Sequence, residues 1–226
     1  MREQFHEELD GLSDVLVEMT RLVGSAVSRA TTALLDADLA LAETVIGADE
    51  AVDALQVELE ERSLALLARQ APVATDLRVV VTGLRMSADL ERMGDLARHV
   101  AKLARMRYPE SAIPAELRAT ILQMGQVAER IVAKTGSVIA SRDLTVAGEL
   151  ETDDDVMDAL HRDLFSVLLD DEWEHGIETA VDVTLCGRYY ERFADHAVSV
   201  AQRVTFLVTG ERRGAREHGF GDSRVR

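Results

Sequence analysis

The sequence of 226 residues contains a single cysteine, Cys186, and only three prolines. One cysteine can form no internal disulfide and cannot build a cysteine-rich zinc site, so we expect Cys186 to be a small core residue. Long proline-free stretches favour long helices over many short strands and turns. Aromatic residues make up 4% of the chain and apolar residues 47%, so the core must be aliphatic.

Long apolar runs and positive charge are also scarce. No stretch approaches the ~18 consecutive apolar residues of a membrane span, and the first residues, MREQFHEELD, lack the pattern of a secretory signal. We therefore expect a soluble, cytoplasmic protein that meets a membrane only through its partners. Acidic residues number 41 against 25 basic ones, for a formal net charge of -16. Because that charge repels phosphate backbones, nucleic acid is not an expected partner.

The common catalytic motifs are missing as well. There is no GxxxxGK[ST] loop, no GxGxxG after a strand and no GxSxG motif, so nucleotide hydrolysis and serine-hydrolase chemistry are not expected. Two Glu-x-x-His matches, at Glu3 and at Glu172, lie near the N-terminus and at a helix end. Di-iron bundles place this spacing in mid-bundle, so we expect neither a ferritin-like oxidase nor another enzyme.

Apolar residues recur at steps of three and four along most of the chain, the pattern of helices with one buried face. This pattern predicts helices over about 3–36, 39–69, 76–107, 114–141, 144–171 and 176–209. Asp36 or Asp38 can cap the second helix and Thr75 the third. Helices of this length fit antiparallel bundles, in which each helix runs the full length of its neighbours.

The chain also repeats itself. An offset of 105 residues places the first two helices on the fourth and fifth, with matches such as Leu12 on Leu117 and Met19 on Met124. An offset of 100 places the third helix on the sixth. The predicted fold is therefore all-α, with two tandem antiparallel three-helix bundles at residues 1–108 and 115–209 and a linker at 109–114. We expect residues 210–226, which are polar and aperiodic, to form a disordered tail.

The repeat supplies four acidic pairs at spacing i, i+4: Asp49 with Asp53, Glu91 with Asp95, Asp154 with Asp158, and Glu191 with Asp195. Residues four apart share a helix face, where like charges repel. An adjacent arginine could compensate, as could a cation that prefers carboxylate oxygens. A single such pair is usually solvated, but the same acids recur in both copies while most flanking residues differ. This recurrence indicates a shared constraint.

Other polar side chains near these acids have simpler readings. His161 shares a face with Asp154 and Asp158, but its counterpart is Gln56, which argues against a ligand role. Basic residues gather at the end of the third helix, where they complement the helix dipole; they are Arg92, Arg98, His99, Lys102, Arg105 and Arg107. A docking patch for an acidic partner is the alternative interpretation of this basic group.

Three segments resemble the PhoU family. Residues 68–78 (ARQAPVATDLR) resemble the turn between its second and third helices, and residues 90–95 (LERMGD) and 190–195 (YERFAD) look like its paired E(D)xxxD motifs. The resemblance spans about residues 1–210. His196 fits a histidine that often follows the second motif, whereas the first copy has Leu96.

The resemblance implies a fold of two similar three-helix bundles and metal clusters held by the acids of each copy. The ligands would be the eight residues already paired: Asp49, Asp53, Glu91 and Asp95, then Asp154, Asp158, Glu191 and Asp195. The metal would be a divalent or trivalent ion such as Mg, Mn, Fe or Zn. Members of the family regulate the phosphate-starvation response negatively, linking the Pst phosphate transporter, through its ATPase subunit, to a sensor histidine kinase.

Long exposed helices also make a homodimer a reasonable expectation. Two other functions stay open on the residues alone. The chain could be a metal-free helical adaptor with another partner, its acids merely solvated. It could also be a carboxylate-metal enzyme, although no nucleophile or general base is placed beside the acids.

Overall fold

The computed structural model describes residues 2–70 and 72–211. Within these ranges the chain is helical and contains no strand. The elements are α1 (Arg2–Asp36), α2 (Leu39–Ala48), α3 (Glu50–Gln70), α4 (Ala74–Arg107), the 3₁₀ turn η1 (Ala115–Leu117), α5 (Arg118–Ser141), α6 (Leu144–Leu168) and α7 (Gly176–Thr209). Residues 212–226, most of the expected tail, lie outside the described residues.

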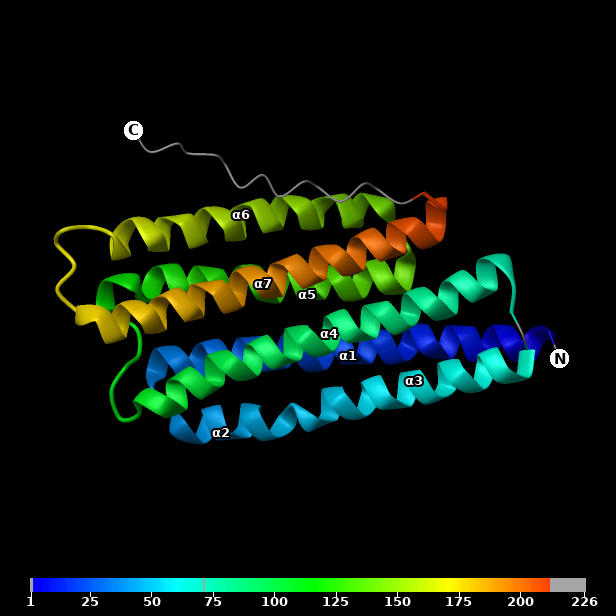
Figure 1. Ribbon diagram of the computed structural model, residues 1–226, viewed down its shortest axis with the longest axis horizontal. Coiled ribbons are helices and arrows are strands. Elements are labelled where there is room, and N and C mark those ends of the chain that lie inside the picture. The colour runs from blue at the N-terminus through cyan, green and yellow to red at the C-terminus, as the bar shows by residue number, and fades with distance from the viewer. Residues whose placement is uncertain (1, 71, 212–226) are drawn as a thin grey trace.

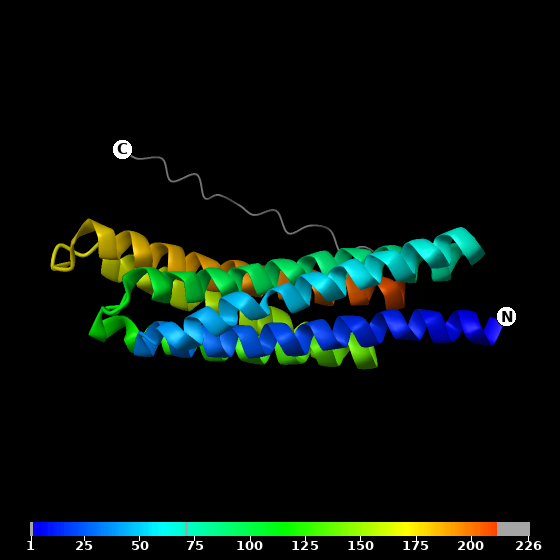
Figure 2. The same cartoon turned by 90° about the horizontal axis from the view of Figure 1, so that it is seen from below.

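The helices form two antiparallel three-helix bundles that lie side by side (Figure 1). In the first bundle α2 and α3 together take the place of one long helix between α1 and α4; the second bundle contains α5, α6 and α7. Helices α1 and α4 pack along α5 and α7, so these four occupy the middle of the molecule. Helices α2, α3 and α6 lie at its two opposite edges (Figures 1 and 2). The predicted all-α fold of tandem bundles is confirmed.

The same capping residue begins the second helix of each copy. The Asp38 carboxylate accepts a hydrogen bond from the Leu41 N–H at 2.9 Å, and the Asp143 carboxylate accepts one from the Thr145 N–H at 2.8 Å. Each cap satisfies an amide that the first helical turn leaves without an intrahelical partner. Of the two caps considered for residue 39 onward, Asp38 is therefore the one used.

Four details of the predicted helices are wrong. The helix predicted over 114–141 begins only at Arg118, after the 3₁₀ turn η1. The helix predicted over 39–69 breaks at Asp49, whose carbonyl accepts hydrogen bonds from both Val52 and Asp53 and whose side chain is buried. Thr75 is not a cap, because α4 begins at Ala74 after Val73, which makes no side-chain capping bond. The helix predicted to end at 171 ends at Leu168. Each error concerns where a helix ends, where local turn contacts decide.

One continuous aliphatic core runs through both bundles. At its centre the fully buried Tyr190 of α7 shares a hydrogen bond of 2.7 Å between its hydroxyl and that of Thr31 on α1. Gly125 of α5 faces the same threonine, and a Cβ at this glycine would lie 2.6 Å from Thr31 Cγ2. Cys186 is also buried in this core, and burial raises the pKa of its thiol far above the usual value.

None of the described helices is both long enough and apolar enough to cross a membrane. The core instead takes its apolar surface from one face of each helix, as the helical periodicity of the sequence predicts.

Candidate functional site

The structure brings the four predicted acids of each copy into one neighbourhood, between the outer helix of each bundle and the helix that carries the E(D)xxxD motif. In the first copy Asp49 and Asp53 come from the α2–α3 edge and face Glu91 and Asp95 of α4. In the second copy Asp154 and Asp158 of α6 face Glu191 and Asp195 of α7. We call these the first and second acid clusters. Because α3 and α6 lie at opposite edges, the clusters lie on opposite flanks (Figure 1).

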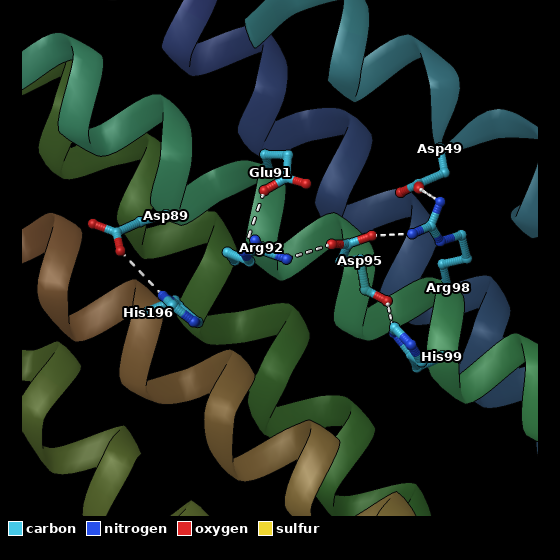
Figure 3. Close-up of polar contacts among 8 residues, drawn as sticks. All are labelled: Asp49, Asp89, Glu91, Arg92, Asp95, Arg98, His99 and His196. Atoms are coloured by element: carbon cyan, nitrogen blue, oxygen red, sulfur yellow. Dashed lines mark hydrogen bonds and ion pairs between the residues drawn. The ribbon is translucent and has the colours of Figure 1, made fainter.

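Arginines fill the first acid cluster (Figure 3). The Arg98 guanidinium lies 2.7 Å from Asp49 Oδ2 with one nitrogen and bonds Asp95 Oδ1 with another. Arg92 bonds the other Asp95 oxygen at 3.0 Å and lies 3.6 Å from Glu91. The Arg98 guanidinium thereby joins α4 to the break between α2 and α3. A guanidinium is the planar group best suited to pairing with carboxylates.

Burial and mutual repulsion still act on these acids. Burial raises the pKa of Asp49, and Asp53 and Asp95 raise it further, while the Arg98 guanidinium opposes them. Burial also raises the pKa of Glu91, together with the charge of Asp95, while Arg92 opposes. Gly94 lets Asp49 lie close to α4, because a Cβ at residue 94 would lie only 3.2 Å from Asp49 Oδ1. The first cluster is thus tightly packed and internally paired.

In the second acid cluster, repulsion between carboxylates adds to the effect of burial. Burial raises the pKa of Asp154 to about 7, and the charges of Asp158, Asp195, Asp155 and Glu191 add to the rise. Burial also raises the pKa of Glu191, although Arg188 pairs with one of its oxygens. The other oxygen, Oε2, is buried and accepts no hydrogen bond from the described residues.

The basic side chains beside the two clusters differ at several positions of the repeat: the first copy has Lys102 where the second has Gln202, and the second has Arg188 where the first has Ala88. The offset of 100 residues places Arg98 on Val198, an aliphatic side chain that can pair with no carboxylate. The first cluster therefore has a guanidinium between two of its carboxylates, whereas in the second Arg188 pairs with Glu191, and burial and the neighbouring carboxylates raise the pKa of Asp154. Carboxylate oxygens are the ligands that hard cations prefer. Within the described residues no three Asp, Glu, His or Cys side chains converge closely enough to surround one ion.

Arg105 and Arg107 lie in the last turn of α4, where a basic residue complements the helix dipole, but two members of the basic group also form ion pairs. Arg98 bridges the first cluster, and Arg107 pairs with Glu178 and Asp182 of α7. A signal for Arg98 was present in the sequence, because Asp95 and Arg98 are three residues apart on one helix face. No spacing indicated the partners of Arg107, since they lie in the other copy.

Sequence reasoning also missed the contacts of Asp89. This buried carboxylate of α4 bonds two side chains of α7: His196 Nδ1 at 3.0 Å (Figure 3) and Arg203 Nε at 2.7 Å. The histidine that follows the second motif therefore contacts the first bundle. His161 lies beside the second cluster, where burial and the charge of Arg188 lower its pKa.

The two tandem helical bundles, each with the same acidic motif, define a class of repeat proteins. Comparison of the chain with known proteins identifies that class. The family model described as the PhoU domain matches residues 16–104 and 121–204. The chain belongs to the PhoU family.

Named relatives match over nearly their whole length. The phosphate-specific transport system accessory protein PhoU homolog 2 of Mycobacterium tuberculosis is 52% identical over 210 residues, covering 93% of this chain and 99% of the relative. PhoU homolog 1 of Mycobacterium leprae is 51% identical, covering 93% of this chain and 95% of the relative. The crystal structure of PhoU from Pseudomonas aeruginosa superposes with a TM-score of 0.82 at 29% identity, covering 92% of this chain and all of that one.

Proposed function

We propose that this protein is a regulatory accessory protein of phosphate transport that represses the phosphate-starvation response in the cytoplasm. The observation that carries the proposal is 52% identity, over 93% of the chain, to a phosphate-specific transport system accessory protein. Because its relatives are described as accessory proteins, we infer that the chain acts by binding other proteins rather than by catalysis. Its partners would be the ATPase subunit of the phosphate transporter and a sensor histidine kinase.

Exposed apolar side chains support a binding role. At the start of α7, Ile177, Val181 and Leu185 form a stripe at helical spacing with exposed fractions of 85%, 50% and 41%. Leu169, 81% exposed, lies in the turn just before. Contiguous exposed apolar surface is typical of protein interfaces. The stripe would serve either a partner or the second copy in a homodimer.

A cation would belong chiefly to the second acid cluster. Asp154, Asp158, Glu191 and Asp195 would hold it, and the positive charge of the ion would offset the repulsion among these carboxylates. Asp49, Asp53, Glu91 and Asp95 are the matching set in the first copy, where Arg98 already occupies the space between two of them. Mg, Mn, Fe and Zn are the candidate ions.

The experiment that tests the regulatory role is deletion of the gene, together with any second PhoU-family gene, in cells grown in high phosphate. Mycobacterium tuberculosis has both homolog 1 and homolog 2, so a second gene must be considered. A reporter for phosphate-starvation genes should switch on, and a plasmid copy of this chain should silence it. A reporter that stays off in the double deletion, or stays on with the plasmid, contradicts the proposal.

A metal-free adaptor is the second candidate, favoured by the arginine-filled first cluster. The two are separated by the metal content of protein purified without chelator, compared with the variant Asp154→Asn plus Glu191→Gln. Equal metal content in the two proteins would favour the adaptor. Loss of metal in the variant would favour the second cluster as a cation site.

A further inference from the structure

A basic groove lies along the seam between α4 and α7, near the start of α4 and the end of α7. Its volume is about 300 Å³, at the small end of the range for ligand sites. The side chains that matter for its chemistry are Arg78, Thr82 and Arg85 of α4, and Ser199, Gln202 and Arg203 of α7. None of the eight lining residues is acidic, although the chain as a whole has a net charge of -16.

Only part of this positive charge is neutralised. Arg203 donates to Asp89 at 2.7 Å, and Asp89 also bonds His196. Arg78 lies over the ring of Phe206, with 5.2 Å between the guanidinium carbon and the ring centroid. Within the described residues neither Arg78 nor Arg85 forms an ion pair with a carboxylate. Two guanidinium groups at this groove therefore have hydrogen-bond donors available to a ligand.

The opposite end of the same seam shows that packing does not require this imbalance. The offset of 100 residues places Arg78 on Glu178 and Thr82 on Asp182. There Arg107 crosses from α4 and pairs with both acids. The same two helices thus meet with matched charges at one end and with unmatched arginines at the other. Like charges around a small cavity repel each other, and a bound anion relieves that repulsion.

We propose that this groove binds a phosphate-type oxyanion. Guanidinium groups present forked N–H donors that match the geometry of a tetrahedral oxyanion. The Thr82 hydroxyl of α4, with the Ser199 hydroxyl and Gln202 amide of α7, adds neutral donors to the lining of the groove. The ligand is either free orthophosphate or the phosphoryl group of a nucleotide, because both present the same oxygens. This site is separate from the acid clusters and does not rest on the proposed function.

The test is equilibrium dialysis of the full chain with radiolabelled orthophosphate, and separately with labelled ADP, at low ionic strength. A chelator is present, so that no metal in the acid clusters mediates binding. The test variants are Arg85→Gln alone and Arg78→Gln with Arg85→Gln. The control, Arg105→Gln with Arg162→Gln, makes the same charge change at two exposed arginines outside the groove. Thermal unfolding of each protein checks that it is folded.

The parent and the control should bind a probe saturably, and the double variant should bind it more weakly by about tenfold or more, as expected for the loss of charged donors. The single variant, which removes no contact formed within the described residues, should show an intermediate loss. Saturable binding of ADP but not orthophosphate identifies the nucleotide as the source, and the reverse identifies free phosphate. Absence of saturable binding of either probe at millimolar concentration overturns the proposal, as does equal binding by the double variant and the control.

Discussion

The charge of Asp154 should make the metal-free protein less stable at neutral and alkaline pH. Burial and four neighbouring carboxylates raise its pKa from 3.8 to about 7. A group whose pKa is higher in the folded state loses its proton more readily when the chain unfolds. The resulting penalty is absent well below pH 3.8, grows as pH rises from about 4 to 7, and is constant above 7. Asp154→Asn removes it.

The size of the effect follows from the shift. Each pKa unit corresponds to about 1.36 kcal/mol, so a rise of about three units bounds the penalty near 4 kcal/mol. Neighbouring acids take up part of the proton binding in a coupled cluster, which lowers the share that belongs to Asp154. We expect Asp154→Asn to raise the free energy of unfolding by about 2 kcal/mol at pH 8 and by under ~1 kcal/mol at pH 5.

The assay is urea denaturation of both proteins at several pH values with a chelator present, followed by circular dichroism. Asp163→Asn, at an exposed position of the same helix, is the control and should change stability by no more than ~0.5 kcal/mol at any pH. Adding Mn²⁺ should reverse the order at pH 8, because only the parent keeps the full set of carboxylates. A gain that is the same at pH 5 and pH 8 would refute the electrostatic reasoning.

Three further substitutions test the packing and the pairing. Arg98→Val, which gives the first cluster the residue found in the second, should lower the free energy of unfolding by about 1–3 kcal/mol in chelator, because Asp49 loses its buried partner. It should also raise the metal content measured after dialysis against Mn²⁺, and unchanged metal content would count against Arg98 as the cation of the first cluster. Tyr190→Phe should lower the free energy of unfolding by about 0.5–1.5 kcal/mol, because only the hydroxyl bond to Thr31 is lost; a neutral result in urea denaturation would show that bond to be dispensable. Gly125→Val should cost about 1–3 kcal/mol by the same assay through overpacking against Thr31, and a more stable variant would mean that α1 and α5 separate freely.

Helical periodicity and the internal repeat were sufficient to predict the fold. Both signals come from short stretches of sequence. The buried face of each helix shows as apolar residues at steps of three and four, and the matching caps Asp38 and Asp143 mark the start of the same helix in each copy. The break at Asp49 was not predictable in this way. At the break the Asp49 carbonyl accepts two hydrogen bonds and its buried carboxylate pairs with Arg98, 49 positions along the chain, and periodicity within one helix reports neither contact.

The acids of the candidate site were predictable because they repeat, and Arg92 repeats with them as Arg192. Arg98 was indicated only by its spacing from Asp95, and its contact with Asp49 was not predictable. Arg98 has no counterpart in the second copy, so comparing the copies gave it no weight. Asp89 and Arg203 meet across the seam between the bundles. The sequence pattern of each helix does not show which residues of α4 lie opposite which residues of α7. A repeat shows what its copies share, while the contacts that join two copies fall on residues that differ.

The antiparallel arrangement of α4 and α7 has a consequence for how the molecule can be approached. Each acid cluster lies between an outer helix and a central one, and the outer helices α3 and α6 lie at opposite edges (Figure 1). One chain therefore carries two versions of a single ancestral surface, back to back. Arg98 pairs with two acids of one version, whereas in the other burial and neighbouring carboxylates raise the pKa of Asp154 to about 7. A partner that approaches one edge therefore meets acids paired with Arg98, and a partner that approaches the other edge meets acids whose protonation changes near neutral pH.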